Sequence, residues 1–150
     1  MHLKGKFSCV GMSDAGRVRE HNEDTIGTDA DIGLVVLADG MGGYKAGEVA
    51  SGMATTLLGS ELEKAFQKTA PHQLDASGKL YSHSVLEAEI ARANTAIYQA
   101  AQSQPQYAGM GTTLVVALFY DNMMTVAHIG DSRLYRLRGD EFHAVTRDHS

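Results

Sequence analysis

The hydrophobic and polar positions along the chain first follow a pattern typical of strands. An unbroken apolar run, Leu34–Ala38, leads straight into Asp39 and predicts a short strand that is buried on both faces. Glycines directly after Asp39 predict a turn in which the backbone comes close to another group. Before this run, the segments 7–10 and 25–27 favour two further short strands.

The pattern then becomes helical. Over residues 49–66, apolar side chains recur at steps of three and four, which predicts a helix with one apolar face. Residues 68–83 are mostly polar and favour a surface connection. The segment Ser84–Glu87 matches a capping box, so we expect a second helix to begin there and to end near Pro105.

Beyond residue 109 the sequence favours strands again, divided by short turn sequences. The predicted strands are 112–120, 123–129, 134–137 and 142–145. They predict an antiparallel meander that follows two helices. This order is typical of an α+β protein, with helices packed on the faces of a sheet.

Composition narrows the classes of function. The chain has 150 residues, of which 43% are hydrophobic and 21% charged, as expected for one globular domain. The net charge of -5, without a basic cluster, argues against nucleic acid and anionic membranes as partners. Cys9 is the single cysteine, so neither a disulfide framework nor a zinc cluster is expected. Neither a signal peptide nor a membrane span is predicted, and a cytoplasmic protein is expected.

Polar side chains gather where the predicted strands end. The three groups are Arg19 with Glu23 and Asp24, Asp39 with Gly40, and Asp131 with Arg133. Carboxylates and a backbone carbonyl are hard oxygen ligands that suit magnesium or manganese, whereas a guanidinium suits a phosphate. Each group also has an ordinary structural interpretation, as a turn or as a surface ion pair. The spacing excludes an EF-hand and a Walker phosphate loop.

Four segments in this order resemble a known family. They are SDAGRVREHNED, VVLADGMGGYKAGEVAS, GMGTTLVVAL and HIGDSRLYRLRGDEFHAVTRDHS. Together they resemble the metal-dependent serine/threonine protein phosphatases of the type 2C (PPM) family, in their bacterial form, over essentially the whole chain. The resemblance implies a four-layer α-β-β-α sandwich of antiparallel sheets with helices on both outer faces. Residues 1–150 are then expected to be the N-terminal part of one catalytic domain, incomplete at its C-terminus.

The resemblance also implies a set of metal ligands for two or three Mn²⁺ or Mg²⁺ ions. Asp39 would bridge two ions, and the Gly40 carbonyl would bind one of them. Glu23 and Asp24 would hold metal-bound waters, and Asp131 would help to bind a third ion. The two later aspartates of the family, together with its mobile flap, have no counterpart in this sequence, so little activity is expected from these 150 residues alone.

The implied reaction is the hydrolysis of phosphoserine or phosphothreonine in proteins by a metal-activated water, opposing a bacterial serine/threonine kinase. Asp39 and Arg19 would be catalytic, with Arg19 holding a phosphate oxygen. Met41 stands where members from higher organisms have a histidine proposed as the general acid, so that proton must come from another group. His21 is expected to be a solvated neighbour. The alternatives are a truncated, non-catalytic phosphoprotein- or partner-binding module and a purely structural domain.

Overall fold

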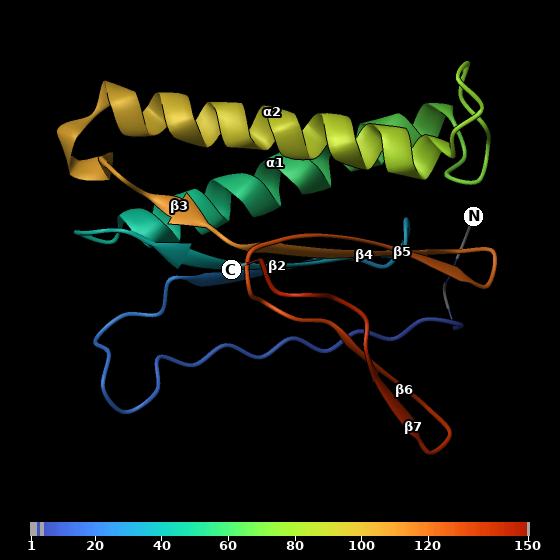
Figure 1. The fold of residues 1–150 in the computed structure, drawn as a ribbon, viewed down its shortest axis with the longest axis horizontal. Coiled ribbons are helices and arrows are strands. Elements are labelled where there is room, and N and C mark those ends of the chain that lie inside the picture. Colours follow the sequence, from blue (N-terminus) through green and yellow to red (C-terminus); the bar gives the residue numbers. More distant parts are fainter. Residues whose placement is uncertain (1–2, 4, 150) are drawn as a thin grey trace.

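The computed structural model describes residue 3 and residues 5–149, which form a helical layer packed on an antiparallel sheet (Figure 1). The helices are α1 (Ala46–Lys68) and α2 (Tyr81–Ser103), followed by the short 3-10 helix η1 (Pro105–Tyr107). The strands of the sheet are β1 (Asp24–Asp29), β2 (Leu34–Met41), β3 (Gly111–Thr112), β4 (Leu114–Tyr120) and β5 (Met123–Ile129). A separate hairpin consists of β6 (Tyr135–Arg138) and β7 (Glu141–Ala144).

The strand order of the sheet is β1-β2-β4-β5, and β3 pairs with the end of β2. All pairings are antiparallel, as predicted, but the predicted meander is divided into two hairpins, because β4 pairs with β5 and β6 with β7, and no pairing joins β5 to β6 among the described residues. The turn between β4 and β5 has two successive residues with positive φ, Asp121 at 46° and Asn122 at 59°. Two such residues are what a tight hairpin turn requires, and Asp and Asn tolerate that conformation well.

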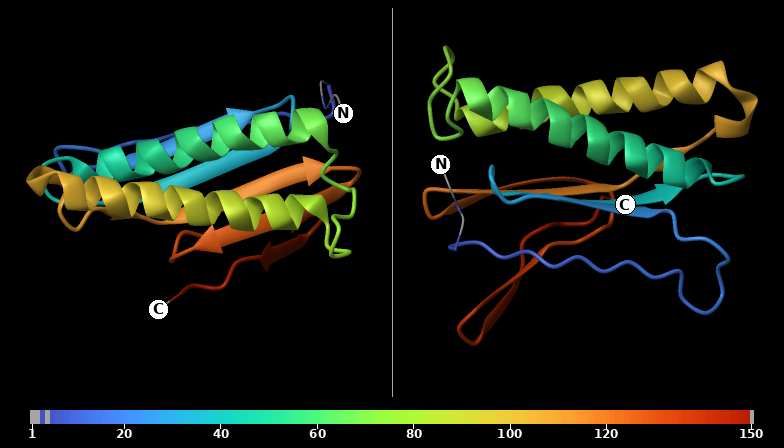
Figure 2. Two further views of the ribbon diagram at one scale, coloured as in Figure 1. Left: turned by 90° about the horizontal axis from the view of Figure 1, so that it is seen from above. Right: turned by 180° about the vertical axis from the view of Figure 1, so that it is seen from behind.

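Strand β2 alternates between the two faces of the sheet. Its residues Leu34, Val36 and Ala38 are buried under the helices, where they meet apolar residues of α1 such as Leu58. Leu37, on the opposite face, is 39% exposed. The prediction that this strand is buried on both faces is therefore wrong for the described residues. The reason is geometric, because both helices lie on the same side of the sheet (Figures 1 and 2).

The other side of the sheet faces the N-terminal segment and the β6–β7 hairpin, as Figure 1 shows. Phe7 contacts the aromatic ring of Phe119 there, with 5.0 Å between the ring centroids. The strand predicted at 7–10 does not form, since these residues pair with no strand in the described part of the chain.

The predicted start of the second helix is also wrong. Helix α2 begins at Tyr81, and the Ser84 hydroxyl donates a hydrogen bond to the carboxylate of Asp75 instead of capping the helix. The same carboxylate accepts hydrogen bonds from the backbone N–H groups of Ser77 at 2.9 Å and Lys79 at 3.0 Å. A tertiary partner nine residues earlier has thus replaced the local capping interaction.

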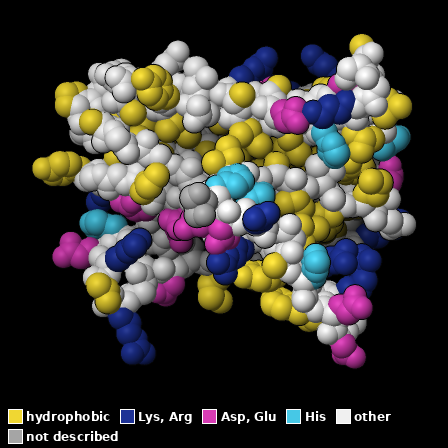
Figure 3. Space-filling model, in the orientation of Figure 1, with side chains coloured by type: hydrophobic (Ala, Val, Ile, Leu, Met, Phe, Trp, Pro, Cys, Tyr) yellow, Lys and Arg dark blue, Asp and Glu magenta, His cyan; other side chains and the backbone are white. Residues whose placement is uncertain are grey.

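The α+β class with antiparallel strands is confirmed. Of the predicted four layers, the described residues contain one helical layer, one sheet and the β6–β7 hairpin. Hydrophobic side chains are exposed on the face shown in Figure 3, where α2 meets the edge strand β5. Among the described residues, neither long helix combines the length and the apolar character that crossing a membrane requires.

Candidate active site

Two carboxylates face each other across β1 and β2. The register of these strands pairs Asp24 directly with Asp39, so both side chains lie on the sheet face opposite the helices. Partial burial raises the pKa of Asp39, and a hydrogen bond with Asp24 together with the negative charge of Asp24 raises it further. Two acidic groups in direct contact cannot both ionise easily without a cation.

Two further charged groups reach Asp39 from distant parts of the chain. The positive charge of Arg19, which precedes β1, lowers the pKa of Asp39, whereas the negative charge of Asp131, which follows β5, raises it. The fold therefore brings Asp24, Asp131 and the predicted phosphate-binding Arg19 within electrostatic range of Asp39. In sequence, Arg19 and Asp131 lie more than 100 residues apart.

Glu23 is held against the beginning of α1. Its backbone carbonyl accepts hydrogen bonds from the N–H of Gly40 at 3.2 Å and from the Ser51 hydroxyl at 2.7 Å. Its carboxylate lies so close to Gly47 that a Cβ atom there would be 2.0 Å from Oε2. A Cβ on Gly40 would lie 1.9 Å from the carbonyl oxygen of Gly47. Both glycines are therefore needed for the close approach of β2 to α1.

Thr113 fixes the backbone of Asp39. The N–H of Asp39 donates to Thr113 Oγ1 at 3.1 Å, and the N–H of Thr113 donates to the Asp39 carbonyl at 2.9 Å. The Thr113 hydroxyl also lies 2.7 Å from the hydroxyl of Ser132, the residue after Asp131. Thr113, Ser132 and Ser51 were not predicted from the sequence to have a role in the site, although each lies in a segment that resembles the family. Their hydrogen-bond partners are distant in sequence, so no local pattern reveals these contacts. Only their place within the family-like segments could have pointed to them.

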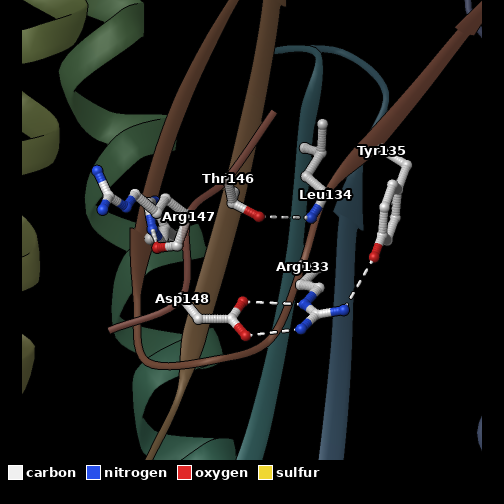
Figure 4. A network of polar contacts seen from close by, with 7 residues as sticks. Arg133, Leu134, Tyr135, Thr146, Arg147 and Asp148 are labelled. Carbon is white, nitrogen blue, oxygen red and sulfur yellow. Dashed lines mark hydrogen bonds and ion pairs between the residues drawn. The ribbon is translucent and has the colours of Figure 1, made fainter. Parts of the chain in front are cut away.

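Arg133, which the sequence grouped with Asp131, belongs to a different interaction (Figure 4). Its Nε and Nη2 atoms donate to the two carboxylate oxygens of Asp148 at 2.9 and 2.7 Å, and Nη1 donates to the Tyr135 hydroxyl at 3.1 Å. Asp148 raises the pKa of Arg133, and Arg133 lowers the pKa of Asp148. This guanidinium is already satisfied by a carboxylate and is not available for a phosphate.

Arg19 differs from Arg133 in this respect. In the described part of the chain, no salt bridge engages the exposed side chain of Arg19, whose positive charge acts on Asp39. A guanidinium presents five N–H donors that match the oxygens of a phosphate group. The arrangement thus offers a free guanidinium beside a pair of carboxylates.

The oxygen donors of Asp24 and Asp39 are the described groups that best fit a divalent metal ion. Among residues 3 and 5–149, no group of three or more His, Cys, Asp or Glu side chains is spaced to hold a metal. The pair of Asp24 and Asp39 nevertheless fits a cation, because these oxygen ligands repel each other and a positive charge between them would relieve that repulsion. A cavity of about 230 Å³ lies at the other end of the sheet, near Ile32 and Phe66, and is separate from this pair.

Comparison with known proteins places the chain in a family. The sequence pattern of the family described as Protein phosphatase 2C matches residues 15–150. Protein phosphatase PhpP of Streptococcus pneumoniae serotype 2 is 40% identical over 142 residues, which are 93% of this chain and 54% of PhpP. The crystal structure of the Mycobacterium tuberculosis serine/threonine phosphatase PstP/Ppp has a TM-score of 0.75 at 37% identity, covering 91% of this chain and 52% of that one.

A further structure is that of the catalytic domain of the serine threonine protein phosphatase PstP in complex with two manganese ions. It has a TM-score of 0.74 at 38% identity and covers 91% of this chain and 54% of that one. The fold and the paired carboxylates define an α+β domain with an acidic site at the ends of β1 and β2. The chain belongs to the protein phosphatase 2C family, and it spans about half the length of the relatives that it matches.

Proposed function

We propose that the intact protein removes phosphate from phosphoserine and phosphothreonine in proteins, and that residues 1–150 are the N-terminal part of its catalytic domain. The observation that supports this most directly is the pairing of Asp24 with Asp39 beside the unengaged guanidinium of Arg19. It is also supported by the relatives named above, since PhpP is described as a protein phosphatase and PstP/Ppp as a serine/threonine phosphatase, and each match covers more than 90% of this chain.

The proposed cofactor is two or three Mn²⁺ or Mg²⁺ ions. Asp39 and the Gly40 carbonyl would bind them directly, Asp24 and Glu23 would hold their waters, and Asp131 would contribute to a third ion. Bound divalent ions supply a Lewis acid and lower the pKa of water to the physiological range. The hard oxygen donors and the raised pKa of Asp39 support this assignment.

The chain's own residues have separate roles in the proposed reaction. Asp39, positioned by Thr113, supplies negative charge at the end of β2. Arg19 binds the phosphate through two of its N–H donors and stabilises the charge that builds up on the phosphate oxygens. Met41 carries no proton to donate, so the leaving group takes its proton from another group.

The partners follow from this function. We propose phosphorylated bacterial proteins as substrates and a cognate serine/threonine kinase as the opposing enzyme. We also propose a cytoplasmic location, where such a kinase would place phosphate on soluble targets. The single cysteine, Cys9, is exposed and unpaired, which agrees with a reducing compartment.

The test is hydrolysis of a phosphothreonine peptide by the protein expressed from its complete reading frame. We expect turnover with Mn²⁺ or Mg²⁺, none with EDTA, and a loss of at least about 100-fold in kcat for Asp39→Asn. Asp140→Asn, an exposed aspartate at the β6–β7 turn, is the matched control and should keep full activity. Unchanged activity of Asp39→Asn would contradict the proposal, and tight phosphopeptide binding without turnover would favour the non-catalytic binding module.

A further inference from the structure

A side-chain hydroxyl takes the place of a backbone carbonyl next to Asp39. The register of β2 with β3 and β4 places Thr113, the residue between those two strands, opposite Asp39. Opposite residues that form a hydrogen-bonded pair normally exchange two backbone hydrogen bonds. Here the N–H of Thr113 donates to the Asp39 carbonyl at 2.9 Å, but the N–H of Asp39 donates to Thr113 Oγ1 at 3.1 Å. The Thr113 carbonyl accepts instead from the Thr112 hydroxyl at 2.8 Å.

The Thr113 hydroxyl links this end of β2 to the loop that follows β5. The strand pairing does not require the hydroxyl, because a backbone carbonyl would satisfy the N–H of Asp39 equally well. Thr113 Oγ1 also lies 2.7 Å from Ser132 Oγ, and a hydroxyl can take part in both hydrogen bonds at once. The side chain of Thr113 therefore ties the backbone of Asp39 to the residue that follows Asp131.

The residue before Asp131 also lies close to Thr113. A Cβ atom on Gly130 would be 2.9 Å from Thr113 Cγ2 and 3.1 Å from Thr113 Cβ. Gly130 has a φ of 98°, a conformation that glycine adopts without steric cost. Asp131 thus stands between two neighbours of Thr113, with Gly130 against its methyl group and Ser132 against its hydroxyl.

These contacts act against an electrostatic repulsion. The negative charge of Asp131 raises the pKa of Asp39, which means that the two ionised carboxylates disfavour each other. Without a cation, the loop that carries Asp131 would lower its energy by moving away from β2. The hydrogen bond between Thr113 and Ser132 restrains this movement, because it joins the loop to the strand end that carries Asp39.

We propose that the Thr113–Ser132 hydroxyl pair positions Asp131 relative to Asp39 for the binding of divalent ions. Thr113 and Ser132 are positioning residues, since they act through the two aspartates. The inference rests on the proposed function, which assigns Asp39 and Asp131 to the same group of ions. It adds that metal affinity depends on two hydroxyls outside the proposed set of ligands, as is common for groups that orient a metal ligand.

The experiment measures Mn²⁺ binding by isothermal titration calorimetry, with the protein expressed from its complete reading frame. Thr113→Val keeps the shape of the side chain without its hydroxyl, and Ser132→Ala removes the other hydroxyl of the pair. We expect each variant to raise the Kd of at least one bound Mn²⁺ ion by about tenfold. Thr113→Ser keeps the hydroxyl and should bind Mn²⁺ as the wild type does. Adding Ser132→Ala to Thr113→Val should cause no further loss, because the two hydroxyls act through one hydrogen bond.

Thr125→Val is the matched control. The Thr125 hydroxyl lies 2.8 Å from the Tyr120 hydroxyl in the core. The register across β4 places Thr125 level with Leu34, at the opposite end of β2 from Asp39. Losing this hydrogen bond should lower the stability to urea in EDTA and leave the Kd for Mn²⁺ unchanged. A purely structural role of Thr113 would give the same result for Thr113→Val.

Unchanged Mn²⁺ binding in both Thr113→Val and Ser132→Ala would overturn the inference, and so would an equal loss of Mn²⁺ binding in Thr125→Val. If the wild type hydrolyses a phosphothreonine peptide and these variants bind Mn²⁺ equally well, the inference fails while the proposed function stands. If the variants weaken Mn²⁺ binding as expected but the wild type shows no turnover, the hydroxyl pair keeps its positioning role and the phosphatase function fails.

Discussion

Asp24 and Asp39 are directly opposed partners in the register of β1 and β2, and Asp24 raises the pKa of Asp39 through a hydrogen bond and its negative charge. Without a cation, the protein holds two acidic side chains against each other at the ends of the edge strand β1 and its neighbour β2. Such a pair is unfavourable for folding. It becomes favourable when a divalent ion binds between the two groups.

Replacing Asp24 should therefore have opposite effects on stability and on metal binding. Asp24→Asn is expected to increase the metal-free stability by about 0.5 kcal/mol, because the repulsion with Asp39 is removed. The same change should weaken Mn²⁺ binding, because one negative charge is lost. Urea unfolding in EDTA and calorimetric titration with Mn²⁺ measure the two effects. Asp29→Asn, at the other end of β1 opposite Leu34, is the control, and an equal effect there would contradict the argument.

Arg19 and Arg133 should respond differently to removal. Arg19→Ala is expected to raise KM for a phosphothreonine peptide by about tenfold or more, because the proposed charge-assisted contact with the phosphate would be lost. Mn²⁺ affinity should change less. Arg133→Ala should leave KM near the wild-type value, because its guanidinium is already held by Asp148. Steady-state kinetics gives both values. A larger effect of Arg19→Ala on metal affinity than on KM would move Arg19 out of the phosphate site.

Gly47 and Gly52 both lie in α1, but only Gly47 packs closely against the site, so alanine substitutions at the two positions measure how tight this packing is. Gly47→Ala places a Cβ 2.0 Å from Glu23 Oε2 and 2.7 Å from the Met41 nitrogen, so we expect a loss of about 1–3 kcal/mol in the free energy of unfolding. Gly52→Ala meets no atom within 4 Å and should gain about 0.5–1 kcal/mol from its better helix propensity. Chemical denaturation compares the two variants. A stabilising Gly47→Ala would show that the contact with Glu23 is not tight.

Asp75 should make the fold sensitive to acid. Hydrogen bonds from the hydroxyls of Ser77 and Ser84 and from the N–H of Lys79 hold the pKa of Asp75 well below its usual range. A lowered pKa means that the folded state favours the ionised form, so this contribution is complete above the unfolded pKa of about 3.9 and is lost as the pH falls further. Asp75→Ala should be less stable than the wild type at pH 7, and the difference should shrink below about pH 4.

Urea unfolding at a series of pH values measures this difference. Asp140→Ala is the control, since Asp140 lies exposed at the β6–β7 turn, and its effect on stability should not depend on pH in this range. A constant difference between the wild type and Asp75→Ala from pH 7 to pH 3 would contradict the hydrogen-bonded role of the carboxylate.

The sequence by itself determined the order and kind of the elements. The three- and four-residue period placed α1 because a helix needs only local hydrogen bonds and one apolar face. Strand β5 occupies the predicted residues 123–129, bounded by turn residues that act locally. The ordered motifs also determined the family, since they are a property of the chain and not of its packing.

Only the tertiary structure decided which side chains meet. Cross-strand register placed Asp24 opposite Asp39, and sheet topology brought Asp131 and Arg19 to the same pair. Asp148 engaged Arg133, which the sequence had grouped with Asp131. These outcomes depend on contacts between residues far apart in the chain, and no local pattern encodes them. The same reason explains why β2 is buried on one face alone, because burial depends on the layer that covers a strand.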